Sequence, residues 1–264
     1  MELLISALNA NPEELLKTMK VCSKFVLVNQ CDEDNESEYI KEDLNGKIRQ
    51  SKARGVGLSR NLCLDKSTEE IILFGDEDII YDEGYASLVD AEFSAHPDAD
   101  IILFNVRVSP ERKTYWNESF ESVGRFGCGR FPAYSIACKR EKLVETNVKF
   151  STLFGGGAKY SNGEDSLFLT DAIKAGLKVY KTPTVIGEET YRESTWFKGY
   201  TEKFFFDRGV LFAFLYEGLL KYLFAFRFLT KSEMYKGEIK RGKALKLILK
   251  GIKAGKLEKK SATN

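Results

Sequence analysis

Three consecutive acidic residues, Asp76, Glu77 and Asp78, directly follow the apolar run 71–75. That run predicts a strand that is buried on both faces. Carboxylates this close repel one another, and a bound cation would relieve the repulsion. Mg²⁺ and Mn²⁺ prefer oxygen ligands, commonly one or two carboxylates together with phosphate oxygens and water. The cluster therefore indicates a Mg²⁺ or Mn²⁺ site at a strand end; the alternative is an acidic turn that caps the next helix.

A second candidate segment, "ARGVGLSRNLCLDKS" at 53–67, contains two glycines and two arginines and predicts a short helix before the acidic strand. We expect Arg60 and Asn61 in the first turn of that helix, near the same edge of the sheet. Backbone N–H groups at a helix start and an arginine side chain both favour a diphosphate. A flexible basic surface loop is the alternative.

A third segment, "FGGGAKYSNGEDSLFL" at 154–169, combines three consecutive glycines with an acidic pair, Glu164 and Asp165. Consecutive glycines allow a ligand to approach the backbone closely. Asp165 could act as a general base that takes a proton from an attacking hydroxyl. Acidic residues in a first helical turn also complement the helix dipole and need no other purpose. A carboxylate stabilised by the dipole has a low pKa, so its position would have to supply much of the catalytic help.

Strand and helix patterns alternate over the first ~180 residues, which predicts an α/β fold. Strands apolar on both faces, separated by helices, indicate a mostly parallel sheet with helices on both sides. Asn11 is the expected N-cap of the first helix, with proline at its first position. The expected strands are the run that ends at Asn9 and the segments 24–30, 71–75, 101–106, 133–140 and 177–180, with a helix at 165–176.

Polar residues collect at the predicted carboxyl ends of these strands. Asn9 ends the first strand, Asp32 lies just past the second, and the cluster 76–78 follows the third. Ligands of such folds bind in the crevice outside these strand ends. The acidic stretch 31–43 is most simply a solvated loop.

The C-terminal part predicts helices of two kinds. Residues 204–229 are rich in aromatic side chains but contain too many charges for a membrane-spanning helix. This run suits core packing, a homodimer surface or contact with lipid. Residues 238–253 place Leu245, Ile248, Leu249 and Ile252 on one helical face and lysines on the other.

The net charge of +1 over 264 residues hides an asymmetry. From Lys231 onward there are 11 Lys/Arg and three Glu, an excess of +8 that leaves −7 for the rest. A basic tail indicates an anionic partner, and an amphipathic helix on an anionic membrane is one interpretation. Nucleic acid is not expected, because basic and aromatic residues are not interleaved as in a recognisable binding module. A solvated lysine-rich end is the alternative.

The five cysteines argue against a disulfide framework or a zinc cluster. Their number is odd and no pair has C-x-x-C spacing, so reduced thiols are expected. No signal peptide is recognisable at "MELLISALNA", which is acidic and enters a strand directly. We therefore expect a cytoplasmic protein, with peripheral attachment to the inner face of the membrane as an extension of that expectation.

In order, "LN" at the first strand end, Asp32, "GLSRN", "GDED" and "GGGAKYSNGEDSLF" resemble the GT-A glycosyltransferases of glycosyltransferase family 2. Together with "ESTWFKGYTEKFF", they are most similar to bacterial members that assemble cell-surface polysaccharides. The resemblance covers roughly residues 1–210. It implies a GT-A-type, Rossmann-like domain over 1–200 and a helical, basic extension over 201–264.

The resemblance also implies a role for each matching residue. Asp165 would be the catalytic base, and Glu164 would help to place the acceptor. Asp76 and Asp78 match the D-x-D motif, with Asp78 the stronger candidate for the metal ligand. The residues expected to bind the donor are Leu8, Asn9 and Asp32 at the base and ribose, Arg60 near the diphosphate, and Asp76 and Glu77.

The sequence departs from some relatives in its metal ligands. Its only histidine is His96, in an expected surface loop, so a later histidine that completes metal coordination in some GT-A enzymes is absent. Glu188, Glu189 or water would fill that position. Trp196, Gly156 and Gly157 are the expected acceptor contacts, although Trp196 and its neighbour Phe197 could instead pack the C-terminal helices onto the sheet.

These features predict an inverting, metal-dependent glycosyltransferase. Its donor would be a nucleotide sugar, with a UDP-sugar as the leading candidate, and its acceptor a saccharide or a lipid-linked saccharide. One alternative is a nucleotidyltransferase with the same site, which would release pyrophosphate. The other is a non-catalytic glycosyltransferase-like subunit that associates with a membrane.

Overall fold

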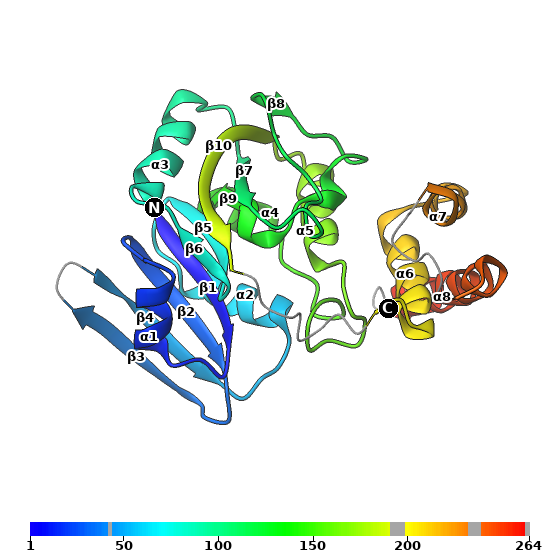
Figure 1. Ribbon diagram of the computed structural model, residues 1–264, viewed down its shortest axis with the longest axis horizontal. Helices are drawn as coiled ribbons and strands as arrows, with labels where there is room; N and C mark the ends of the chain where they lie inside the picture. The colour runs from blue at the N-terminus through cyan, green and yellow to red at the C-terminus, as the bar shows by residue number, and fades with distance from the viewer. Residues whose placement is uncertain (42–43, 191–198, 232–238, 262–264) are drawn as a thin grey trace.

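The computed structural model describes residues 1–41, 44–190, 199–231 and 239–261. A ten-stranded sheet runs through the body in the order β3-β4-β2-β1-β5-β9-β7-β10-β6, and β8 pairs with β10 (Figure 1). The strands are β1 (Glu2–Leu8), β2 (Lys24–Gln30), β3 (Asn35–Lys41), β4 (Leu44–Ser51), β5 (Ile71–Asp76), β6 (Ile79–Tyr81), β7 (Ile101–Arg107), β8 (Glu121–Ser122), β9 (Ile136–Lys139) and β10 (Val179–Glu189).

The central strands are parallel, as the sequence predicts. β4, β2, β1 and β5 pair in parallel with one another, and so do β7 and β10. β9 lies between these two groups and is antiparallel to both β5 and β7. The expected α/β fold with a mostly parallel sheet is therefore confirmed.

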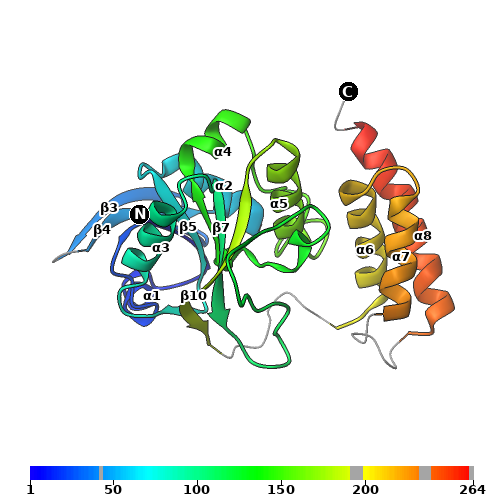
Figure 2. The ribbon, with the colours of Figure 1, turned by 90° about the horizontal axis from the view of Figure 1, so that it is seen from above.

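Alternating residues of the strands fill two separate cores, which explains why the strands are apolar on both faces. In β1, Leu3 and Ile5 enter one core and Leu4 enters the other. The first core includes side chains of α1 (Pro12–Thr18) and α3 (Tyr85–Ala95). The second includes side chains of α2 (Val56–Lys66), α4 (Arg140–Thr146) and α5 (Glu164–Lys174). Figure 2 shows these two helical layers on opposite sides of the sheet.

Local signals at the start of the chain are also confirmed. The Asn11 side chain accepts hydrogen bonds from the backbone N–H groups of Glu13 and Glu14, and Pro12 opens α1. The prediction that 31–43 is a solvated loop is wrong, because Asn35–Lys41 forms β3 at the edge of the sheet. β3 is almost wholly exposed, so its side chains carry no apolar alternation that would indicate a strand.

The C-terminal helices form a bundle of α6 (Glu202–Leu215), α7 (Leu220–Lys231) and α8 (Arg241–Ser261). α6 and α8 approach so closely that a Cβ added at Gly251 would lie 2.0 Å from the carbonyl oxygen of Phe206. Ile248 and Ile252 are buried in the bundle, whereas Leu249, predicted on the same helical face, is 42% exposed. Within the described residues, no helix combines the length and apolar character needed to cross a membrane.

Hydrogen bonds and an ion pair connect the bundle to residues 159–161, just before α5. The carboxylate of Asp207 on α6 accepts hydrogen bonds from both the backbone N and the Oγ of Ser161, each at 2.9 Å. Glu258 on α8 pairs with Lys159 at 2.8 Å and accepts a hydrogen bond from the Tyr160 hydroxyl at 2.6 Å. One apolar cluster joins the two parts, with Phe154, Tyr160 and Leu167 from the body and Val210, Leu211 and Leu215 from α6.

Candidate active site

The carboxyl ends of β1, β2 and β5 meet at one edge of the sheet because these three strands are parallel. Asn9 follows β1 with φ of +51°, and its backbone N–H donates to the carbonyl of Gln30 at the end of β2. The carboxylate of Glu77 accepts a hydrogen bond from the backbone N–H of Leu8 at 2.9 Å. The structure thus brings the polar residues of 8–9 and 76–78 together, and it gives Glu77 a structural partner.

Arg60 lies one turn deeper in α2 than expected. The helix begins at Val56 after Gly55, so Arg60 is in its second turn, where it is only 3% exposed. The adjacent Asn61 is also buried and exchanges hydrogen bonds with the backbone of Phe150. The prediction that both residues lie in the first turn is therefore wrong, and so is the alternative of a flexible surface loop.

The guanidinium of Arg60 connects all the candidate acidic motifs. Its Nη2 lies 2.8 Å from Oδ1 of Asp76, and its Nη1 lies 3.1 Å from Oε1 of Glu164 and 3.0 Å from Oδ1 of Asp165. The three carboxylates come from the end of β5 and the start of α5. The buried guanidinium of Arg60 therefore brings Asp76 of the D-x-D motif close to the Glu164–Asp165 pair.

These contacts and the burial of the cluster shift the pKa values of Arg60 and Asp165. Burial alone would lower the pKa of Arg60, but the carboxylates of Asp76, Asp165 and Glu164 raise it, so the side chain stays charged. Burial and the adjacent Glu164 raise the pKa of Asp165 well above its ordinary value, although Arg60 lowers it. Burial and the adjacent Glu164 therefore oppose the low pKa that a position at the start of a helix would favour.

Asp78 has a different environment from Asp76. Burial, together with the carboxylates of Asp76 and Glu189, raises the pKa of Asp78 to about 7. Glu189 ends β10, pairs with Arg112 at 2.7 Å and has a side chain only 3% exposed. Glu188 is on the exposed side, 3.7 Å from Arg107. Of the two residues expected to complete the metal site, Glu189 therefore lies beside Asp78.

These residues fit a divalent cation only in part. Across the described ranges, no group of three or more His, Cys, Asp or Glu side chains is arranged to hold a metal ion. Asp76 is engaged by Arg60, whereas Asp78 faces like charges that a cation would relieve. Asp76 and Asp78 therefore suit a cation that also has diphosphate oxygens as ligands, and not one that the protein alone would enclose.

The glycine run connects the two helices that carry the acidic site. The carbonyl of Gly156 accepts a hydrogen bond from the N–H of Val56, the first residue of α2. Gly155 has φ of +104°, and a Cβ there would lie 2.8 Å from Cδ of Glu164. Glycine is therefore required beside the Glu-Asp pair. Gly157 follows, also with positive φ.

Asp32 lies beyond the end of β2, where its carboxylate is 98% exposed and 2.7 Å from Arg54. Arg54 also donates to the carbonyls of Cys31 and Ser51, so it fixes the loop between β4 and α2. Arg54 is one of the two arginines of the segment 53–67, but its contact with Asp32 could not be read from the sequence. Arg112 had no local signal, because its partner Glu189 lies 77 residues further along the chain.

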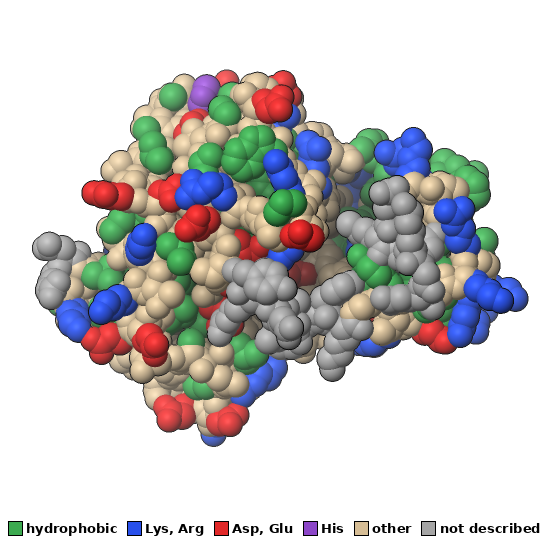
Figure 3. Space-filling model, in the orientation of Figure 1, with side chains coloured by type: hydrophobic (Ala, Val, Ile, Leu, Met, Phe, Trp, Pro, Cys, Tyr) green, Lys and Arg blue, Asp and Glu red, His purple; other side chains and the backbone are tan. Residues whose placement is uncertain are grey.

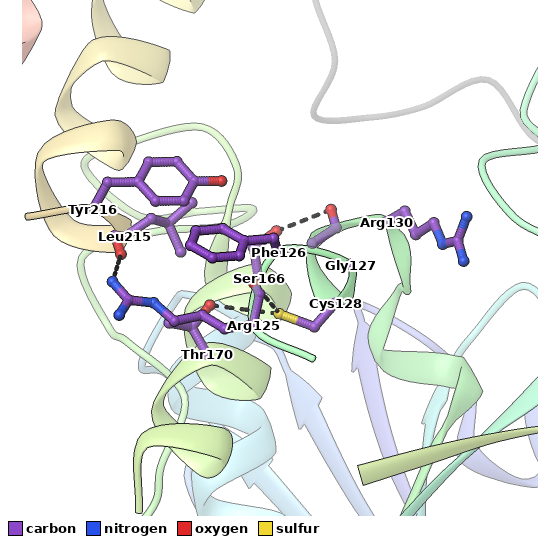
Figure 4. Close-up of a pocket in the computed structure, with 10 residues that line it drawn as sticks. Arg125, Phe126, Gly127, Cys128, Arg130, Ser166, Thr170, Leu215 and Tyr216 are labelled. Atoms are coloured by element: carbon purple, nitrogen blue, oxygen red, sulfur yellow. Dashed lines mark hydrogen bonds between the residues drawn. The ribbon is translucent and has the colours of Figure 1, made fainter. Parts of the chain in front are cut away.

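A cavity of about 370 Å³ opens beside the start of α5. Ser166 and Thr170 lie on its wall, one turn apart on α5, and Ser166 directly follows Asp165 (Figure 4). Arg125 donates to the carbonyl of Leu215 at the end of α6, at 3.2 Å. The cavity is lined by Arg125, Phe126, Gly127, Cys128, Gly129, Arg130, Ser166, Thr170, Leu215 and Tyr216.

Two other expectations concern side chains away from this site. His96 is at the end of α3, where its ring stacks on Phe120, so it contributes nothing to the acidic site. All five cysteines are free thiols, as expected. Trp196 and Phe197 lie outside the described residues.

Comparison with known proteins identifies the family of the chain. Residues 3–161 match the family described as Glycosyl transferase family 2. A search of curated proteins finds no significant sequence match.

Among solved structures, the chain is similar to residues 1–349 of TarS from S. aureus in complex with UDP-GlcNAc. The TM-score is 0.59 at 16% identity, covering 96% of this chain and 72% of the other. It is also similar to the mannosyltransferase PcManGT from Pyrobaculum calidifontis in complex with GDP-Man and Mn²⁺. There the TM-score is 0.53 at 17% identity, with 96% and 74% coverage. At these identities the likeness establishes the GT-A-type fold.

Proposed function

The chain belongs to glycosyltransferase family 2, and on that premise we propose that it moves a sugar from a nucleotide-diphosphate sugar to an acceptor hydroxyl. The nucleotide sugars in the similar structures, UDP-GlcNAc and GDP-Man, support a donor of this class. A UDP-sugar is the leading candidate. The donor would occupy the edge of the sheet at Leu8, Asn9, Asp32 and the 76–78 cluster.

The observation that carries this proposal is the link made by Arg60. A single buried guanidinium contacts Asp76 on the donor side and Asp165 on the acceptor side. Charge that develops on a departing diphosphate is stabilised by cationic groups already held in place. The charge of Arg60 is already shared among three carboxylates, so Arg60 would hold Asp76 and the proposed base Asp165 in position, and the neutralisation of the diphosphate would fall to the cation bound at Asp76 and Asp78.

In the mechanism that follows, Asp165 takes the proton of the acceptor hydroxyl. Its raised pKa makes it a better base than an ordinary aspartate. Glu164, held on the same guanidinium, orients the acceptor. The hydroxyl attacks the anomeric carbon from the face opposite the diphosphate, so the configuration inverts.

Asp76 and Asp78 would hold Mg²⁺ or Mn²⁺ jointly with the donor. The presence of Mn²⁺ with GDP-Man in the PcManGT structure supports this choice of ion. The cation would neutralise charge on the diphosphate. Glu189 supplies further negative charge beside Asp78, while Arg112 holds it in place.

The acceptor would approach from the side of Gly156 and Gly157 and of the 370 Å³ cavity next to Ser166. A saccharide, free or carried on a lipid, suits a cavity that combines arginines with aromatic side chains. With such an acceptor, the reaction would belong to the assembly of a cell-surface polysaccharide or glycolipid.

Ligand-induced thermal stabilisation tests the proposal. We would measure melting temperatures with nucleoside diphosphates and nucleotide sugars, with and without Mn²⁺. The expected result is a shift for one nucleotide that requires Mn²⁺ and is lost in Asp78→Ala. The absence of any shift at millimolar ligand would overturn the donor site.

Product analysis then separates the reaction classes. A glycosyltransferase releases a nucleoside diphosphate, whereas a nucleotidyltransferase releases pyrophosphate. Activity of the purified chain alone excludes a non-catalytic subunit.

A further inference from the structure

The outward face of α7 is apolar, which is the reverse of an ordinary surface helix. Leu219 just before it, and Leu223 and Phe226 within it, are 78%, 62% and 64% exposed. The side turned toward the bundle holds Ala225 and Leu229, together with Lys221, which is 8% exposed. Leu220 and Tyr222 widen the exposed face. A contiguous apolar surface of this kind marks an interaction site.

The neighbouring helix α8 is strongly basic. Residues 241–261 contain eight Lys/Arg and one Glu, a net charge of +7. Within the described ranges, five exposed lysines on α8 form no ion pair, and the exposed Leu249 and Leu257 lie among them. These five are Lys246, Lys250, Lys253, Lys256 and Lys260.

The apolar and basic surfaces adjoin. Lys256, Lys259 and Lys260 line one shallow hollow together with Gly218 of the α6–α7 connection and Lys221 of α7. The exposed Leu219 directly follows Gly218 in the chain. In Figure 3, Lys/Arg and hydrophobic side chains are both visible on the part of the surface that the bundle forms. We call this combined face of α7 and α8 the basic–apolar face.

We propose that the basic–apolar face docks on an anionic membrane surface. Lysines that flank exposed leucine and phenylalanine side chains can bind anionic headgroups while the apolar side chains enter the boundary with the acyl chains. A second copy of this chain is a poorer partner, because two faces that each carry the +7 helix would repel one another.

The face also continues toward the cavity beside α5. The ring of Phe126, 63% exposed, stacks on Phe224 of α7 with centroids 5.8 Å apart, and Phe224 stacks on Tyr216 at 3.9 Å. Phe126 and Tyr216 both line that cavity. If the proposed function holds, a membrane at this face would present a lipid-linked acceptor next to Asp165.

Vesicle co-sedimentation of the full chain tests the docking. We expect binding to phosphatidylcholine vesicles that contain phosphatidylglycerol, release by salt, and no binding to phosphatidylcholine alone. Lys253→Gln/Lys256→Gln should weaken binding on the order of tenfold or more. Leu223→Ser/Phe226→Ser should weaken it by a similar factor. The matched control Lys17→Gln/Lys52→Gln, with exposed lysines on the body, should bind as the wild type does.

Several outcomes would overturn the proposal. These are equal binding to neutral vesicles, no binding to either kind, or equal losses in the body control. Sedimentation velocity adds another: a dimer that dissociates in Leu223→Ser/Phe226→Ser would assign the face to self-association. Thermal stabilisation by nucleotides should be the same in all these variants, so failure of docking and failure of the proposed function are distinguishable.

Discussion

Charged residues are used in opposite ways at the edge of the sheet and on the C-terminal bundle. At the sheet edge, Arg60 is buried and shared among three carboxylates. On α8, five exposed lysines (Lys246, Lys250, Lys253, Lys256 and Lys260) form no ion pair with any residue that the structure describes, and they lie among leucines. The first region has its charges already fixed by the protein, as expected of groups that act on a bound substrate. The second region keeps its positive charge at the surface, where the proposed membrane docking would use it.

The largest effect should come from removing the base at the sheet edge. Asp165→Asn keeps the size and the hydrogen-bonding capacity of the side chain but cannot accept the proton. We expect transfer to fall by about 10²–10⁴-fold, the usual contribution of general base catalysis. Nucleotide-induced thermal stabilisation should persist. Near wild-type turnover would show that Asp165 is not the base.

Breaking the shared ion pairs should cost the most stability. Arg60→Ala leaves Asp76, Glu164 and Asp165 without their cation, and we expect a loss of about 3 kcal/mol in the free energy of unfolding. Arg54→Ala removes the partner of the exposed Asp32 and should cost less than about 1 kcal/mol. Urea denaturation measures both. Equal losses would mean that burial of the Arg60 cluster has no energetic consequence.

The helix packing of the bundle can be tested within a single helix. Gly251→Ala places a Cβ 2.0 Å from the carbonyl oxygen of Phe206, so α6 and α8 must separate at a cost of about 2 kcal/mol. Gly242→Ala meets nothing within 4 Å and should stabilise α8 by up to about 1 kcal/mol. Thermal unfolding of the two variants should therefore move in opposite directions. The same direction in both would contradict close α6–α8 contact.

A smaller effect than the loss of the Arg60 cluster or of the close helix packing should come from the attachment between the two regions. Asp207→Asn weakens the bonds to Ser161 and removes the charge that pairs with Lys203. A cost of about 1 kcal/mol follows from a charge-assisted hydrogen bond that becomes neutral. The control Glu217→Gln, on the exposed α6–α7 connection, should stay within about 0.5 kcal/mol of the wild type. If the two variants unfold alike, Asp207 does not anchor the bundle.

The sheet was predictable because its signals are local. The strand Lys24–Gln30 is apolar on both faces and needs no distant partner to be recognised. The edge strand Asn35–Lys41 was missed because its exposed side chains lack that pattern. The direction of Ile136–Lys139 is also hidden, since apolar composition does not depend on chain direction.

The residues of the candidate site could be predicted from the sequence, but the ion pairs between them could not. The D-x-D and Glu-Asp motifs are brought together as expected, and their donor, metal and acceptor roles stay predictions. The contacts of Arg60 with Glu164 and Asp165 span 104 and 105 residues, so no local pattern could reveal them. An outward apolar surface was one of the interpretations of 204–229, but the sequence could not separate it from core packing, because apolar side chains are more often turned inward.

The apolar cluster between the body and α6 affects how the protein can be divided for experiments. Phe154, Tyr160 and Leu167 belong to the body, but their packing partners Val210, Leu211 and Leu215 lie beyond residue 200. A truncated chain that ends there would expose these side chains to water and invite aggregation. Fragments for crystallisation or labelling should therefore retain α6. They should also retain α8, because Gly251 of α8 packs directly against the backbone of α6 at Phe206.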